Sequence, residues 1–312
     1  MALATTIRRF SFGLGLFALW IILPLSAHAQ TPDWRESVGV FRVGYLIDGD
    51  QARHRARLEP FRLAMERATG LQVSLSPKRT LDQLIRDQAI RRIQYAVHSA
   101  SSYATTETLC KCLELLAVPS DGTGAIGLHS VVLAAAEGNV GSLSDLKDKR
   151  LAVPAPPATI TRTVALNELA SAGFNPDEAF GDIIDVENPL EGWRLIQQGK
   201  ADAVIGWSTL QGDLSEGYSA GTLRHIIQIA ELGTSADISV LWQSRAVPYG
   251  PHSIRNDLPT PLKSILKEFL LTLQVRDRDA YEAVEPNHSG GFVSVNRQDF
   301  SAVLRIAQPL TE

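Results

Sequence analysis

Cysteine is scarce in this chain, and so are the patterns that mark many enzymes. Only two of the 312 residues are cysteines, Cys110 and Cys112, so disulfides are not what holds the fold together. The seven histidines are scattered, and there is no His-Glu-x-x-His zinc motif and no phosphate-binding P-loop. After residue 25 no run is long and apolar enough to span a bilayer. The sequence therefore favours a binding protein over an exported enzyme, and it predicts no cofactor.

The N-terminus has the pattern of an export signal. Arg8 and Arg9 precede the apolar run 10–25, and residues 26–30 read Ser-Ala-His-Ala-Gln. This order predicts a Sec-type signal peptide, residues 1–29, cleaved after Ala29. A retained membrane anchor is the alternative, and a lipid anchor is not expected because no cysteine follows the run. We therefore expect the mature protein in the periplasm, which is an oxidising compartment.

An excess of positive charge is lacking as well. Residues 1–29 hold two arginines and no acidic residue, so their removal leaves 28 basic and 34 acidic side chains and a net charge of −6. Proteins that bind nucleic acid present a basic surface instead. No nucleic-acid partner is therefore expected.

Hydrophobic periodicity predicts alternating strands and helices in the rest of the chain. This alternation indicates an α/β fold, with two lobes that are each a mostly parallel sheet covered by helices on both faces. Two such lobes on an exported chain suggest a binder that closes on a ligand. The strands are predicted at 40–47, 71–76, 93–97, 129–136, 150–154, 182–186, 201–207 and 238–244, and the helices at 54–70, 81–88, 142–149, 161–173, 190–199, 258–273 and 297–307.

Six segments occur in an order that matches a known family. They are FRVGYL (41–46), YAVHSASSYA (95–104), HSVVLAAAEGNVGSLSDLKDKRLAVPAP (129–156), QGKADAVIG (198–206), SRAVPYGPHSIRNDLP (244–259) and GGFVSV (290–295). Together they resemble the phosphate- and phosphonate-binding, PhnD-like group of periplasmic solute-binding proteins of the type II fold. The resemblance covers nearly all of the mature chain. It implies that residues 38–122 plus 245–312 form lobe one and residues 123–244 form lobe two, with the ligand bound between them.

The segment that holds the anion in phosphonate binders is altered here. The resemblance implies an Asp-Pro followed by a Ser-Thr-Ser run at a helix start, where N–H groups and hydroxyls donate to an oxyanion. This chain has Ala155 in place of the Asp and Ala158 and Ile160 in place of the two serines, and it keeps Thr159. The resemblance therefore implies a changed ligand, or one that is smaller and less charged.

Polar side chains at strand ends and helix starts are the candidate ligand contacts. Helix capping is the alternative role for the serines, and a buried histidine with its own partners is the alternative for His98. The candidates are His98, Ser99, Ser101, Ser102 and Tyr103 after the strand 93–97, Thr159 and Thr161 in lobe two, and Trp207 and Ser208 at the end of the strand 201–207.

Three interpretations fit the two cysteines. They pack inertly at a turn between a helix and a strand, they form a small and reducible disulfide, or their thiolates capture a soft ligand such as Cu(I), zinc or trivalent arsenic. Two thiols without a nearby histidine make a poor zinc site, so no metal is expected, but Cys110 and Cys112 suit arsenite and are a candidate metalloid site. A regular helix from Ser101 would place Cys110 roughly 13 Å from the helix start, at ~1.5 Å per residue.

A cysteine placed after SSYATTET (101–108) is similar to one in the arsenite-sensing periplasmic proteins of the AioX type. This narrower resemblance implies a periplasmic receptor for arsenite, a small oxyanion. Its partner would be the periplasmic domain of a membrane sensor histidine kinase that regulates arsenite oxidation. The alternative is the substrate-binding protein of an ABC transporter for phosphate, phosphite or phosphonate, with an ABC permease as its partner.

Overall fold

The computed structural model describes residues 1–2 and 33–307, apart from the side chains of residues 177 and 230. The predicted signal peptide and its cleavage site lie outside these residues, except for Met1 and Ala2. Among the helices that are described, none combines the length and apolar character needed to cross a membrane.

The first of two sheets has six strands in the order β12-β4-β11-β3-β1-β2. Strand β1 runs parallel to β2 and β3, whereas β11 runs antiparallel to β3 and β4, and β12 runs antiparallel to β4. The strands are β1 (Phe41–Leu46), β2 (Val73–Lys78), β3 (Tyr95–Val97), β4 (Leu113–Ser120), β11 (His252–Arg255) and β12 (Gly291–Val293).

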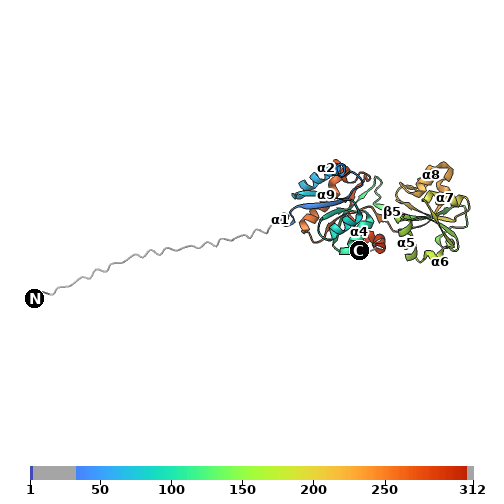
Figure 1. Ribbon diagram of the computed structural model, residues 1–312, viewed down its shortest axis with the longest axis horizontal. Coiled ribbons are helices and arrows are strands. Elements are labelled where there is room, and N and C mark those ends of the chain that lie inside the picture. The colour runs from blue at the N-terminus through green and yellow to red at the C-terminus, as the bar shows by residue number, and fades with distance from the viewer. Residues whose placement is uncertain (3–32, 308–312) are drawn as a thin grey trace. The chain divides into compact units, whose positions relative to one another are not determined.

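Helices cover both faces of this sheet. Successive side chains of a strand point to opposite faces, and buried residues occur on both. Val43 and Tyr95 belong to a core shared with α2, α9 and α10, whereas Ala96 packs with Leu84 of α3 on the other face. Figure 1 shows α2 beside α9 over the blue β1 region. The helices are α1 (Trp34–Val38), α2 (Gln51–Thr69), α3 (Leu81–Ala89), α4 (Ala100–Cys110), α9 (Thr260–Arg276), α10 (Arg278–Val284), the 3-10 helix η6 (Arg297–Phe300) and α11 (Ser301–Ile306).

The second sheet has the order β10-β5-β8-β6-β7, and β9 also pairs with β5. Val132 packs toward α5, and its neighbour Val131 packs toward α7 and α8 on the other face. The strands are β5 (Gly127–Ala135), β6 (Arg150–Pro154), β7 (Asp182–Val186), β8 (Ala203–Ser208), β9 (Ile238–Gln243) and β10 (Val247–Pro248). The helical segments are η1 (Leu143–Leu146), η2 (Thr159–Val164), α5 (Ala165–Ser171), α6 (Pro176–Ala179), α7 (Pro189–Gln197), η3 (Leu214–Glu216), α8 (Thr222–Gln228), η4 (Ala230–Leu232) and η5 (Ser235–Asp237).

The α/β class is confirmed, but the sheets are mixed rather than mostly parallel. In the first sheet the antiparallel strand β11 follows the segment that builds the second sheet, and it enters between β3 and β4. Three predicted α-helices also differ, and one of them, 297–307, divides into the 3-10 helix η6 and the short α11. The segment 142–149 holds only the short 3-10 helix η1, and the segment 161–173 overlaps the π-helical turn η2 before α5. The predicted boundary at residue 245 stays a prediction, and β10 pairs with the second sheet just beyond it.

Candidate ligand-binding site

The carboxyl ends of β1 and β3 open into a cavity of about 500 Å³ beside the start of α4. Ligands of open α/β sheets bind at this edge. Most of the wall is aliphatic or aromatic, and a minority of the lining residues are polar. The polar lining residues are Tyr45, Asp48, His54, Arg57, His98, Ser99, Glu285, Asn287 and His288.

Tyr45 is the feature of this cavity that most needs an explanation. The side chain is 4% exposed, yet its hydroxyl has no hydrogen-bond partner in the part of the chain that the structure describes. Burial raises the pKa of the phenol, and the nearby Arg55 and Arg57 only partly oppose that shift. A buried polar group without a partner is rare in native proteins and costs about 1–3 kcal/mol. Because Tyr45 also lines the cavity, its hydroxyl is a candidate donor to a bound ligand.

Arg57 places a positive charge at the rim of the same cavity, beside His54. The N-terminal turns of α2 carry His54 and Arg57, and Arg57 Nη2 lies 3.3 Å from His54 Nδ1. His54 Nε2 lies 2.9 Å from both the backbone oxygen and the Oδ1 atom of Asp48. Donors of this kind can hold an anion, and the exposed carboxylate of Asp48 moderates their field.

Glu285 and His288 also line the cavity. Glu285 accepts from the buried His252 at 2.9 Å and pairs with His288 at 2.9 Å. Burial pushes the pKa of Glu285 upward, but its hydrogen bonds to the two histidines outweigh burial and leave the pKa below its usual value. This wall is therefore anionic.

His98 lines the cavity, but both of its ring nitrogens are hydrogen-bonded to other side chains of the protein. Nε2 lies 2.6 Å from Gln88 Oε1, and Nδ1 lies 3.0 Å from Ser102 Oγ. Burial, with a smaller contribution from His252, lowers the pKa of His98 to about 3, so the ring is neutral. The bonding favours the alternative of a buried histidine with its own partners, which fixes the start of α4.

The serines after β3 divide between capping and exposure. Ser99 is the N-cap of α4 and forms a capping box with Ser102, which is buried. Ser101 is exposed, and its hydroxyl lies 3.1 Å from that of Ser99. Tyr103 is buried against Phe300, with ring centroids 4.8 Å apart, and does not line the cavity. Ser99 and Ser101 are therefore the two serines with side chains open to solvent.

The four candidates of the second sheet lie elsewhere, and none lines this cavity. Thr159 is exposed at the start of η2, whereas Thr161 is buried. Ser208 is buried, and its hydroxyl accepts from the backbone N–H of Leu210 at 3.0 Å. Trp207 packs edge-on against a histidine ring with centroids 5.8 Å apart. Their contact with a ligand stays a prediction.

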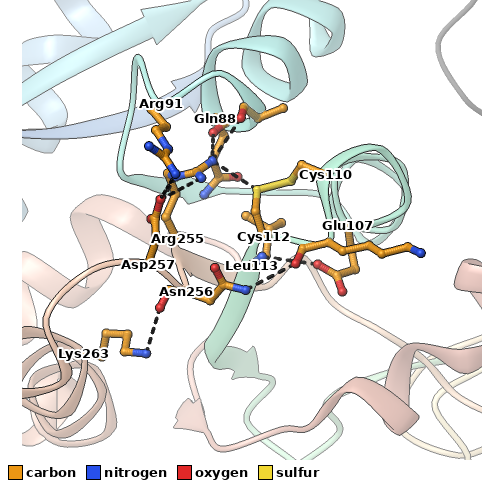
Figure 2. A network of polar contacts seen from close by, with 12 residues as sticks. Gln88, Arg91, Glu107, Cys110, Cys112, Leu113, Arg255, Asn256, Asp257 and Lys263 are labelled. Carbon is orange, nitrogen blue, oxygen red and sulfur yellow. Dashed lines mark hydrogen bonds and ion pairs between the residues drawn. A yellow bond between two sulfur atoms is a disulfide. The ribbon is translucent and has the colours of Figure 1, made fainter.

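Cys110 and Cys112 form a disulfide at the far end of α4 (Figure 2). Cys110 is the last helical residue, Lys111 caps the helix in the left-handed conformation with φ 50°, and Leu113 begins β4. Neither cysteine lines the cavity. Ser99 and Cys110 thus stand at opposite ends of an 11-residue helix. In the oxidised state there is no free thiol to capture a metalloid.

One motif in the chain escaped the sequence reasoning. Residues 217–221 read Gly-Tyr-Ser-Ala-Gly, which has the spacing of a hydrolase nucleophile. The hydroxyl of Ser219 lies 2.7 Å from that of Thr209 and 3.2 Å from that of Thr123. No histidine bonds to it among the described residues, and the segment follows η3 rather than a strand. The pentapeptide is therefore a turn that ends in the N-cap Gly221 of α8, and not a nucleophile elbow.

The two mixed α/β sheets and the cavity at the strand ends define a two-lobed solute-binding protein. A family model described as "ABC transporter, phosphonate, periplasmic substrate-binding protein" matches residues 43–300. The chain belongs to this family, whose members are periplasmic and bind solutes rather than catalyse reactions. No curated protein matches the chain.

Solved structures share this fold at low sequence identity. XAC2383 from Xanthomonas citri, bound to ATP, is 16% identical with a TM-score of 0.55, over 86% of this chain and 98% of that one. A binding protein component of an ABC phosphonate transporter from Pseudomonas aeruginosa is 18% identical with a TM-score of 0.44, over 84% of this chain and 83% of that one. The first likeness supports the fold alone.

Proposed function

We propose that this protein captures a small organic oxyanion for an ABC importer, with the ligand held in the cavity at the ends of β1 and β3. The partnerless hydroxyl of Tyr45 carries the proposal, because it is a buried donor on a residue that lines the cavity, and no protein group accepts its hydrogen bond among the described residues. Arg57, His54 and the exposed Ser99 add donors at the rim. An ABC permease is the proposed partner.

The apolar walls favour a ligand with a hydrocarbon part beside its anionic group. Phe61, Leu75 and Leu84 line the space, which is larger than an inorganic tetrahedral anion needs. The carboxylate of Glu285 disfavours an anion next to it, which leaves the positive charge of Arg57 for the head group. An alkyl or aryl phosphonate matches this division better than phosphate does.

Calorimetry with phosphate and with phosphonates of increasing alkyl length tests the ligand class. Each buried methylene should tighten binding about fourfold, from about 0.8 kcal/mol of transfer free energy. A dissociation constant that does not change with chain length, or tighter binding of phosphate, would overturn the proposed class.

The variant Tyr45→Phe tests the site itself. Removal of the hydroxyl should weaken ligand binding by about 10- to 150-fold, since a hydrogen bond to a charged group contributes about 1.5–3 kcal/mol. The free protein should not lose stability, because the hydroxyl has no partner to lose. The matched control is Tyr281→Phe, whose hydroxyl accepts from the backbone N–H of Gly291 at 3.1 Å. That control should lose stability and keep its affinity.

A periplasmic arsenite receptor that signals to a sensor kinase is the second candidate, and the paired cysteines are the observation that favours it. Direct capture at Cys110 and Cys112 requires their reduction first. Arsenite should then bind the reduced protein and not the oxidised protein or Cys110→Ser. If the oxidised protein binds arsenite, and Tyr45→Phe binds it equally well, then neither the cysteines nor the cavity recognises arsenite.

A further inference from the structure

We propose that the Cys110–Cys112 disulfide is a site of directed thiol–disulfide exchange, in which an external thiol attacks Cys110 and Cys112 leaves as the thiolate. The proposal is independent of the ligand in the cavity. It rests on the difference in exposure between the two cysteines, the short loop that they close, and the guanidinium that contacts one of the sulfurs.

The loop closed by this disulfide is very short, because the two cysteines are separated by two positions in sequence. A disulfide stabilises a fold mainly by restricting the unfolded chain, and the effect shrinks as the closed loop becomes shorter. This bond therefore contributes little to the stability of the fold. Its exchange is correspondingly compatible with a folded protein.

The two cysteine residues differ in exposure. Cys110 is partly exposed, between the exposed residues Leu109 and Lys111, whereas Cys112 is only 8% exposed. An incoming thiolate must approach along the S–S axis, opposite the leaving sulfur. We therefore expect the attack at the sulfur of Cys110, the more exposed residue.

The two sulfurs also differ in their electrostatic surroundings (Figure 2). Nη1 of Arg255 donates to Cys112 Sγ at 3.1 Å, and this guanidinium is 6% exposed. Cys110 instead ends α4, where the helix dipole is negative, one turn after the carboxylate of Glu107. A neighbouring cation stabilises a thiolate and a negative pole disfavours it. Cys112 is thus the better leaving group.

Asp257 moderates the charge of Arg255. It accepts from Arg255 Nε at 3.1 Å and from Nη2 at 3.0 Å, and it also pairs with Arg91 at 2.9 Å. Since Nη1 is left for Cys112 and two backbone oxygens, the same guanidinium serves both the carboxylate and the sulfur. Weakening the carboxylate should strengthen the stabilisation of the Cys112 thiolate.

The exchange balances with a dithiol as the co-reactant. One thiolate of the dithiol forms a mixed disulfide with Cys110 as the Cys110–Cys112 bond breaks, and the bonding pair goes to Cys112. The second thiolate attacks the mixed disulfide and releases Cys110. The dithiol is oxidised to a disulfide, the protein disulfide is reduced by two electrons, and the two released thiolates take up protons according to pH.

The direction of attack can be mapped in the wild-type protein with reduced glutathione as the probe. After an acid quench and alkylation of the freed thiol, trypsin cleaves at Lys111 and separates the two cysteines into different peptides. We expect glutathione on the peptide that ends at Lys111 and the alkyl group on the peptide that begins with Cys112. Glutathione on Cys112, or no adduct on the folded protein, would overturn the proposal.

Rates of reduction by dithiothreitol test the role of Arg255. Arg255→Lys should slow reduction and Asp257→Asn should accelerate it, each about threefold, since the rate rises as the pKa of the leaving thiol falls. Circular dichroism checks that each variant is folded. If Arg255→Lys does not fold, Asp257→Asn alone still tests the proposal. Lys263→Gln, which removes a nearby charge that contacts Glu114, is the control and should not change the rate. Equal rates in the wild-type protein and Asp257→Asn would refute the directed exchange.

Discussion

The buried imidazole of His98 should make the protein progressively less stable below pH 6.5. Its pKa falls from 6.5 to about 3 on folding, chiefly because the charged ring would lose its hydration. Between pH 6.5 and pH 3, His98 is therefore protonated in the unfolded chain and neutral in the folded chain. The contribution is fully favourable above pH 6.5 and is lost as pH falls toward the folded pKa. One proton is worth about 1.4 kcal/mol per pH unit, so the loss reaches about 3 kcal/mol at pH 4.5 and about 5 kcal/mol below pH 3.

The variant His98→Gln isolates this contribution. Glutamine does not titrate, and its amide can still donate and accept between Gln88 and Ser102. Urea unfolding from pH 8 to pH 4.5 should give a difference between wild type and variant that changes by about 3 kcal/mol in favour of the variant as pH falls. His225→Gln replaces an exposed histidine and is the control. A difference that stays constant across this range would refute the reasoning.

Two further substitutions probe contacts near the site and between the sheets. Glu168→Gln should lower the free energy of unfolding by about 1–2 kcal/mol in urea titrations, because the buried carboxylate pairs with Arg245 at 3.1 Å and with Arg305, both partly exposed. An unchanged midpoint would contradict that value. Gly250→Ala should cost about 1–3 kcal/mol or more in the same assay, because a Cβ there would collide with the backbone oxygen of His98. A variant as stable as wild type would show that the backbone around residue 250 can move away from His98 without loss of stability.

Of the nine polar residues that line the candidate site, the sequence predicts two. His98 and Ser99 follow a buried strand, and the rule that ligands bind at the carboxyl ends of strands finds them directly. Tyr45 is missed because alternation along β1 assigns it to the core, with Val43, and no sequence pattern reveals that its hydroxyl has no partner. Glu285 and His288 are missed because they come from a segment far along the chain, and only the fold brings them beside β1.

The fold shows the same division between local and long-range information. Periodicity predicts the long amphipathic helices and the buried strands, because those patterns depend on neighbours in sequence. It does not predict β11 and β12, which are short and are defined by pairing with β4 rather than by their own residues. The mixed character of both sheets follows from such returning strands. The family resemblance supplies the class of fold, and the pairing direction comes only from the structure.

The position of the cysteines shows what helix geometry decides and what it leaves open. Helix α4 holds 11 residues, so at ~1.5 Å per residue its two ends are roughly 16 Å apart. Ser99 at one end lines the cavity, and Cys110 at the other end belongs to the disulfide beside Arg255. A small ligand cannot touch both ends at once. Recognition in the cavity and chemistry at the sulfurs are therefore separate events, which Tyr45→Phe and Asp257→Asn can change one at a time.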